Sequence, residues 1–568
     1  MFKSSTLVLI ILTTLLSTSC DNKKQSHADM IIYSDQIYTG TEDDSAQAVI
    51  ITDGVISALT DRAASEPYVG TQTEIIDAQG SFVMSGLIEG HGHFSGLGEF
   101  LMNLNFLKAK SWDEIVGMVA EKVEQSEPGE WIIGRGWHQE KWMEPVEDHV
   151  HGYPKHFDLS AISPNNPVLL DHASGHGIFV NQKAMELAGI NAETPNPAGG
   201  RIVRDENGQA IGVFEENAED IIKHFYHEYL ETLSEQARID QWHKGIELAQ
   251  DECFKKGITS FQDAGSHFQE VDRYKALAED GNMRIRLWAM IREPLKDLPN
   301  DLSDYRMIGV GNDHFTCRSL KVSLDGALGS FGAWLLESYS DKADFYGQNT
   351  TSIEDITNMG RIALDNNMQF CVHAIGDRAN RETLDIIEKL APNKSDDLRW
   401  RIEHSQHLHP DDIARFGQLG AIASMQGIHC TSDAPYVEKR LGRQRAQEGA
   451  YNWRALIDSG AIVTNGTDAP VEDIDPIESF YASVTRKRAD NGMEFFTENK
   501  MTRAEAIKSY TYNNAYAAFE EDLKGTIEVG KLADFTILSE NWLTCSDEAI
   551  LNTQVKYTIV GGQVMYKQ

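Results

Sequence analysis

Short apolar runs that alternate with helical stretches dominate the central part of this chain. Eight runs have the length and residue types of buried strands: 83–91, 258–263, 283–291, 319–323, 369–373, 399–404, 420–425 and 461–466. Stretches with helical periodicity, such as 242–256 and 353–367, separate them. Eight successive β/α units predict an α/β fold, a TIM-like (β/α)8 barrel whose functional site lies at the C-terminal strand ends.

Candidate metal ligands stand in or directly after these runs. Residues i and i+2 of a strand project to the same face, so His91 and His93 after the first run are placed to bind one cation. The later candidates are Lys321 in the fourth run, His373 and His404 at the ends of the fifth and sixth, and Asp468 after the eighth. Because parallel strand ends meet at one edge of a barrel, the spacing predicts one convergent site.

Length and charge limit the other possibilities. At 568 residues the chain exceeds what one hydrophobic core usually supports, so a large domain with a smaller companion is expected. The 51 basic and 87 acidic residues give a net charge of −36, which opposes binding to nucleic-acid phosphates. We therefore expect no nucleic-acid partner, and we assign the acidity mainly to surface solvation.

The N-terminal segment, residues 1–20, has the pattern of an export signal. Lys3 precedes an apolar core over 7–16, and small residues lead to Cys20. This resembles a bacterial lipoprotein signal with Cys20 lipidated, although Ser17 stands where such signals usually have an aliphatic residue. The resemblance predicts a protein anchored to the cell envelope and facing the periplasm or the exterior. A soluble, secreted or periplasmic protein is the alternative, and sorting between inner and outer membranes stays open.

Short β-like runs occur near both chain ends. We expect a tether over 21–28, then one β-sandwich built from 29–80 and 521–568, with the barrel over 81–520 between them. The barrel carries an insertion, 94–257, which follows its first strand and so emerges at the catalytic face. Trp137, His138 and His176 in this insertion are candidate substrate contacts, and simple packing is the alternative for Trp137.

The motifs at these positions resemble those of the amidohydrolase superfamily, in particular the amidohydrolase-3 branch that includes YtcJ-like and N-substituted formamide deformylase-like proteins. The resemblance covers nearly all of the chain after the signal segment. It rests on six runs: Ser85–His93, Trp131–Trp137, Lys321 with Asp325–Ser330, His373–Ala379, Asn465–Pro470 and Gly525–Asp534.

The resemblance implies roles for individual residues. It makes His91, His93, His373 and His404 metal ligands, and Asp468 both a ligand and the residue that transfers protons. Lys321 matches a position that can be a carbamylated lysine bridging two cations, and an ion pair with a carboxylate such as Asp325 is the alternative. Zinc suits these ligands best, with iron, manganese or nickel also compatible, and one or two ions per chain.

Two further groups of residues lie after the seventh run and within the sixth. Gln426 and His429 match positions where the branch often carries a Gln-Pro-x-x-His run, with Gly427 replacing the proline, so they are candidate substrate contacts. Glu403 precedes His404, so in an extended strand it points to the opposite side, and we expect it to pair with Arg399 or Arg401.

The implied reaction is hydrolysis of a C–N bond in a small molecule. A bound metal would activate water and polarise a carbonyl, while Asp468 takes the proton of the water and returns it to the leaving amine. An amide, formamide or cyclic amide fits this chemistry. A non-catalytic binding lipoprotein and a metal-dependent isomerase or lyase are the alternatives, and the resemblance also suggests a homodimer.

Overall fold

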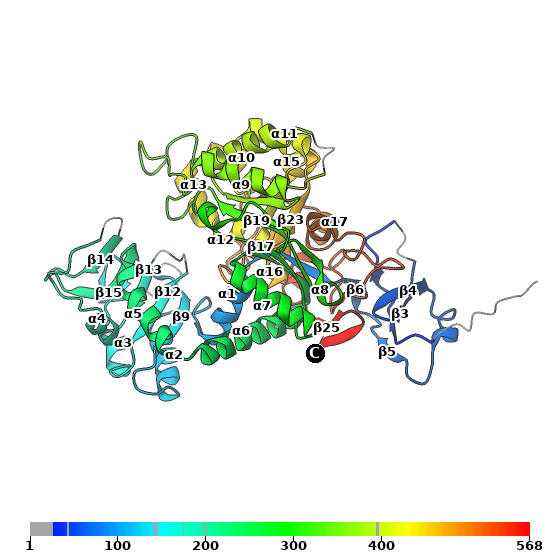
Figure 1. The fold of residues 1–568 in the computed structure, drawn as a ribbon, viewed down its shortest axis with the longest axis horizontal. Helices are drawn as coiled ribbons and strands as arrows, with labels where there is room; N and C mark the ends of the chain where they lie inside the picture. Colours follow the sequence, from blue (N-terminus) through cyan, green and yellow to red (C-terminus); the bar gives the residue numbers. More distant parts are fainter. Residues whose placement is uncertain are drawn as a thin grey trace, which may run out of the picture.

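The structure is a computed structural model that describes residues 27–568, except 43–44, 140–141, 144–145, 174, 176, 198–199 and 394–396. The predicted signal segment with Cys20, most of the predicted tether, and His176 lie outside the described residues. Figure 1 shows the insertion on one side of a central barrel and the sheets near the two chain ends on the other.

Parallel strands form the central barrel, and within the described residues their order around the sheet follows the sequence. They are β7 (Leu87–Gly92), β16 (Ile258–Ser266), β17 (Arg286–Ile291), β19 (Phe315–Ser323), β20 (Gln369–Ala374), β21 (Arg401–His404), β22 (Ile422–Gln426) and β23 (Val463–Gly466). Each consecutive pair is parallel. Nearly all their residues are buried, as expected for a parallel sheet covered on its outer face by helices. The predicted TIM-like barrel is confirmed.

Side chains and loop backbone complete the barrel between its first and last strands. The Asn514 amide nitrogen donates to Ile88 O in β7 at 2.7 Å and to Asn465 O in β23 at 2.9 Å. Glu89 Oε1 accepts from the backbone of Thr467 at 2.6 Å. These bonds replace the backbone hydrogen bonds that would pair β7 with β23 in a fully closed sheet, and they hold the two strands together.

Helices cover the outside of the barrel and connect its strands. The main ones are α1 (Phe94–Met102), α6 (Glu235–Lys255), α7 (Phe268–Glu279), α9 (Ile353–Asp365), α10 (Asp377–Leu390), α11 (Pro410–Leu419), α16 (Pro476–Thr485), α17 (Arg503–Tyr510) and α18 (Tyr512–Ala517). Shorter helices α12 (Gly427–Ser432), α13 (Ala434–Leu441), α14 (Arg443–Gly449) and α15 (Trp453–Asp458) follow β22. Some of the helices begin at a side-chain cap: Ser352 accepts from Asp355 N before α9, and Thr502 forms a capping box with Glu505 before α17.

The first predicted strand, 83–91, is two strands in different sheets. Its first half is β6 (Phe82–Ser85), which pairs with a C-terminal strand, and its second half is the barrel strand β7. Gly86 separates them, and any side chain there would collide with Thr259. A continuous apolar run therefore passes from one sheet to the other at a glycine, which periodicity alone does not reveal.

Two sheets lie near the chain ends. One has the order β4-β3-β1-β5 and the other β2-β6-β24-β25-β26, so the second joins strands from both termini. The strands are β1 (Met30–Tyr33), β2 (Ile37–Tyr38), β3 (Ala48–Thr52), β4 (Val55–Thr60), β5 (Glu74–Asp77), β24 (Phe535–Leu538), β25 (Val555–Val560) and β26 (Gln563–Lys567). One apolar cluster takes side chains from both sheets, including Ile32, Val49, Val83 and Phe535.

The predicted insertion, 94–257, begins and ends with α1 and α6, which pack on the barrel core, and the part between them has its own sheet, in the order β14-β15-β13-β12-β9-β8, and its own apolar clusters. Its elements are β8 (Leu104–Asn105), α2 (Trp112–Glu124), β9 (Ile132–Trp137), α3 (Phe157–Ile162), β12 (Val168–His172), β13 (Gly177–Val180), α4 (Gln182–Leu187), β14 (Gly200–Arg204), β15 (Ala210–Glu216) and α5 (Glu219–Thr232). Among the helices described, none combines the length and apolar character that a membrane crossing needs.

Candidate metal centre

His91 and His93, at the end of β7, both approach the carboxylate of Asp468, which follows β23. His91 Nε2 lies 3.5 Å and His93 Nε2 3.2 Å from Asp468 Oδ1. The backbone fixes this approach, because Asp468 N donates to His91 O at 2.8 Å. The first and last barrel strands thus bring three of the predicted ligands together.

His404 and His373 complete the group from the opposite wall of the barrel. The ring centroid of His404 lies 4.6 Å from that of His91 and 4.5 Å from that of His373. Potential ligand atoms of His91, His404 and Asp468 all lie within 4.8 Å of one another. The structure therefore gathers the predicted imidazoles and carboxylate at the C-terminal ends of four strands.

The backbone at His404 leaves the extended conformation. His404 and Ser405 have φ of 76° and 43°, in the left-handed region that non-glycine residues seldom adopt. Side-chain alternation along β21 ends there, and both Glu403 and His404 face His91. This differs from the expectation that Glu403 points away from the site, which assumed a regular strand.

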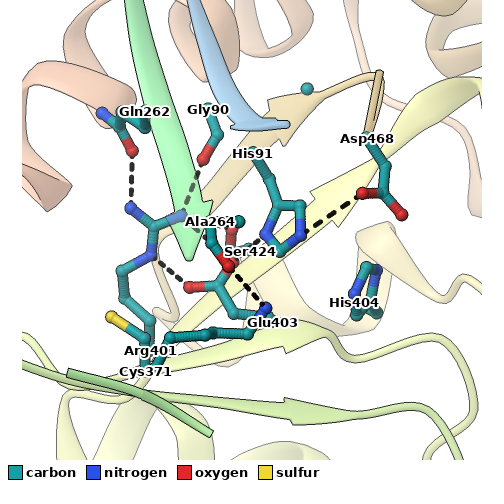
Figure 2. A network of polar contacts seen from close by, with 12 residues as sticks. Gly90, His91, Gln262, Ala264, Cys371, Arg401, Glu403, His404, Ser424 and Asp468 are labelled. Carbon is teal, nitrogen blue, oxygen red and sulfur yellow. Dashed lines mark hydrogen bonds and ion pairs between the residues drawn. The ribbon is translucent and has the colours of Figure 1, made fainter. Parts of the chain in front are cut away.

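Glu403 connects His91 to a buried arginine (Figure 2). Its Oε2 lies 2.5 Å from His91 Nδ1, and its Oε1 lies 2.7 Å from Arg401 Nε. Arg401 also donates to Gly90 O at 2.7 Å and Gln262 Oε1 at 2.5 Å. The predicted Arg401–Glu403 pairing is found, and with it a second role: an ionised Glu403 holds the proton of His91 on Nδ1 and leaves Nε2 with its lone pair toward the site.

We expect Glu403→Gln to weaken metal binding about 10- to 100-fold, because the charged partner that fixes the His91 tautomer is lost. Competition titration with a chromogenic chelator measures the affinity. Glu438→Gln is the matched control, since Glu438 pairs with Arg443 at 3.3 Å on an exposed surface. Unchanged affinity in Glu403→Gln protein with a wild-type melting curve would contradict this role.

Gln426 stands behind His404 rather than in the cavity. Its Oε1 lies 2.8 Å from His404 Nδ1, and its side chain is buried. This contact directs His404 Nε2 toward the centre in the same way that Glu403 directs His91. The structure thus gives Gln426, predicted as a substrate contact, a position from which it orients His404.

Lys321 is buried in β19, and its Nζ donates to Ala264 O at 3.3 Å. The described residues give it no ion pair with a carboxylate. Asp325, the alternative partner considered for Lys321, instead accepts the backbone N–H groups of Trp334, Ile375 and Gly376 at 2.8–2.9 Å. Burial, the largest effect, lowers the pKa of Lys321 to about 8.

A cavity of about 1690 Å³ opens above these strand ends and takes residues from both the barrel and the insertion. His138 and Trp137 both line it. Trp137 is almost fully buried, donates through Nε1 to Leu170 O at 2.8 Å and packs against Phe179, so packing accounts for most of its surface. His429 also lines the cavity: Gln406 Nε2 donates to its Nδ1 at 3.1 Å, and its Nε2 lies 4.0 Å from Asp468 Oδ2.

Burial and neighbouring charge keep the imidazoles of His91, His373 and His404 neutral. Burial, followed by the positive charge of Lys321, lowers the pKa of His91 to about 4 and that of His373 to about 3. Burial also holds the pKa of His404 well below its usual value. For Asp468, burial favours the protonated form, but the hydrogen bond from His93 opposes it, and the pKa lies well below the ordinary range. Neutral imidazoles beside an ionised carboxylate are the protonation states that bind metal.

The unpaired atoms of the site fit a cation. Among the described residues, His91 Nε2 and His373 Nε2 are buried without a hydrogen-bond partner, which is costly unless something else binds them. Imidazole nitrogens with one carboxylate are donors that suit zinc and similar divalent ions. The barrel, with these donors at its C-terminal strand ends, has the arrangement of a metal-binding enzyme site.

The amidohydrolase family model matches residues 74–566, so the chain belongs to the amidohydrolase family. It is 30% identical to the protein named "Putative amidohydrolase YtcJ" of Bacillus subtilis, over 94% of this chain and 98% of that one. It is also 23% identical to the N-substituted formamide deformylase of Arthrobacter pascens, over 95% and 98% of the two chains. A metal-dependent hydrolase from Pyrococcus furiosus, of uncharacterised function, has a similar structure, with a TM-score of 0.70, 25% identity and coverage of 91% of this chain and 100% of that one. The protein is a metal-dependent amidohydrolase.

Proposed function

We propose that the enzyme hydrolyses a non-peptide C–N bond, in an amide, a formamide or a cyclic amide. The observation that carries this proposal is the approach of His91, His93 and His404 to the carboxylate of Asp468 at the mouth of the barrel. The similarity to a protein named as a formamide deformylase, over nearly the full length of both chains, supports the choice of bond.

The residues that would hold the metal are His91, His93, His373, His404 and Asp468, and we propose zinc as the ion. The buried Lys321 has no carboxylate partner among the described residues, which supports carbamylation and a second ion. Carbamylation would turn a positive group that repels cations into an anionic ligand. One ion and two ions per chain are the two outcomes that metal analysis would distinguish.

When bound, the metal supplies a water of lowered pKa and polarises the carbonyl of the substrate. Asp468 then takes the proton of the attacking water and delivers it to the leaving nitrogen, which makes the amine a better leaving group. His429, held through Nδ1 by Gln406, presents Nε2 on the same side as Asp468 and is placed to contact the substrate. His138 lines the wall of the same cavity, on the side of the insertion.

Metal analysis of purified protein lacking residues 1–20, together with assays on matched amide, formamide and ester panels, tests the proposal. We expect one or two zinc ions per chain, loss of turnover with a chelator and recovery on adding zinc. The reason is that the proposed reaction depends on water activated by the bound metal. Turnover that survives metal removal would contradict it. Metal-loaded protein that binds but never converts its ligand would favour a binding lipoprotein, and conversion without hydrolysis an isomerase or lyase.

We further propose that the protein is exported and anchored to the cell envelope through a lipidated Cys20. The support is the sequence of residues 1–20, with Lys3, an apolar core and small residues before the cysteine. We also propose that the two terminal sheets form the predicted β-sandwich, which their shared apolar cluster supports. A homodimer is proposed from the family resemblance alone.

A further inference from the structure

The cavity above the metal centre contains a guanidinium group that the reaction described above does not use. Arg292 follows β17 directly, at the C-terminal end of the strand, and its side chain is exposed in the cavity. Its backbone N donates to Ser266 O at 2.9 Å, which ties this position to the end of the neighbouring strand β16. The base of the side chain is therefore held by the barrel rather than by a free loop.

The stem of Arg292 occupies space that a missing side chain provides. Gly265, in β16, has φ of 141°, and a Cβ built on it would lie 2.7 Å from Arg292 Cδ and 3.0 Å from Arg292 Cβ. A contact of 2.7 Å is shorter than real Cβ atoms show, so any other residue at position 265 would push the stem of Arg292 aside. The glycine thus makes room for the arginine in its present direction.

This direction brings the guanidinium to the strand next to the one that carries His373. Arg292 Nη2 donates to Ser323 Oγ at 3.4 Å, and Ser323 is the register partner of His373 across β19 and β20. The charged group therefore lies one strand step from a predicted metal ligand. Its charge contributes to the lowered pKa values of both Lys321 and His373, which is consistent with this proximity.

Within the described part of the chain, Arg292 has no carboxylate partner. The adjacent Glu293 is engaged elsewhere, because it accepts from Phe268 N at 2.9 Å and lies 3.1 Å from His267 Nδ1. Another arginine in the cavity wall, Arg440, is ion-paired with Asp341 and donates to Gly329 O. The chain has a net charge of −36, so carboxylates that could pair with Arg292 are plentiful. The guanidinium beside the site is nevertheless open to an anion from outside the described residues.

We infer that Arg292 binds an anionic substituent of the substrate, a carboxylate carried close to the bond that is cleaved. A planar guanidinium in the wall of a cavity suits a carboxylate, which can accept two of its N–H groups at once. The cavity, at about 1690 Å³, has room for a substrate larger than a simple formamide. For a formamide the carboxylate must lie on the amine portion, because a formyl group has no position for it, so the substrate class is an N-formyl amino acid or a similar amide. This conclusion rests on the proposed hydrolytic function.

Matched substrates test this inference on the metal-loaded enzyme. N-formyl derivatives of glycine, leucine and phenylalanine are compared with those of methylamine, isoamylamine and phenethylamine, which lack only the carboxylate. We expect the enzyme to prefer the carboxylate member of at least one pair. Arg292→Met should lower kcat/KM for that member about 10- to 100-fold, the usual effect of losing a charge-assisted bond, and change the neutral member less than about threefold.

Lys296→Met is the matched control, since Lys296 is another cation that lines the same cavity, and it should leave the preference intact. Calorimetric binding of the N-formyl amino acids to Asp468→Asn protein, with and without Arg292→Met, gives a readout that does not depend on turnover. If carboxylate ligands bind through Arg292 but no amide is cleaved, the proposed function fails and the inference about Arg292 stands. If amides are cleaved without preference for the carboxylate member, if Arg292→Met affects both members equally, or if no carboxylate ligand binds, the inference is overturned.

Discussion

Asp468→Asn is expected to lower kcat about 10³-fold while leaving the protein folded and metal-loaded. Asparagine has the same shape as aspartate, so the contacts near His91 and His93 can persist, but it cannot accept the proton of the attacking water. General acid–base groups commonly contribute about 10²- to 10⁴-fold to rate, which sets the size of the effect. Steady-state kinetics on whichever amide the wild-type enzyme cleaves, with metal content measured on the same samples, gives the result.

Asp473→Asn is the matched control for this change. Asp473 lies five positions further along the same loop, where its carboxylate pairs with Lys108 at 3.1 Å instead of facing the metal centre. It should retain turnover within about twofold of wild type, as expected for a substitution away from the reacting atoms. Activity in Asp468→Asn protein close to that of the control would rule out Asp468 as the proton-transfer residue. If the variant lost metal and activity together, the main role of Asp468 would be to bind the metal.

Asp534→Ala is expected to lower the free energy of unfolding by about 3–5 kcal/mol, because it leaves a buried arginine without its charge partner. Asp534 lies between the barrel and the C-terminal sheet. Its oxygens lie 2.6 and 2.9 Å from Arg286 Nε and Nη2, and both side chains are almost fully buried. Asp534 Oδ1 also accepts from Gly561 N at 2.8 Å, so the carboxylate joins β17 to the turn before β26.

The neighbouring pair Arg284–Asp251 gives the comparison. Its nitrogen and oxygen are also 2.6 Å apart, but the two side chains are 38% and 57% exposed. Asp251→Ala should cost less than about 1 kcal/mol, because water replaces the lost partner. Urea unfolding followed by circular dichroism measures both variants. Equal small losses would mean that Arg286 finds water or another acceptor when Asp534 is removed.

The barrel could be predicted because its strands have an unusual composition. Strand β17, for example, is buried along its whole length and contains the apolar run 287–291, a pattern typical of parallel strands that are covered on both faces. The ends of these runs then locate the site without further information. The passage from β6 to β7 at Gly86 was not predictable in this way, because both strands are apolar and only their pairing partners differ.

The contacts that orient the site were only partly visible in the sequence. Arg401 and Glu403 are charged residues at alternate positions of a buried strand, a signal that pointed to their pairing. That Glu403 also holds His91 depends on contacts between strands far apart in sequence, 312 positions in this case. The left-handed backbone at His404 has no sequence signal, since neither glycine nor asparagine stands there. The sheet inside the insertion was missed because its short strands carry weak periodicity.

Pairing between the two ends of the chain constrains how this protein can be made. Leu87 N donates to Thr536 Oγ1 across 449 positions, and β6 has β24 as its neighbour. During synthesis the ribosome releases β6 long before β24 has been made. The edge of β6 that β24 later covers is therefore exposed while the barrel strands emerge. Chains stopped short of residue 535 would keep every predicted metal ligand and yet present an open strand edge, the surface that promotes aggregation and recruits quality control.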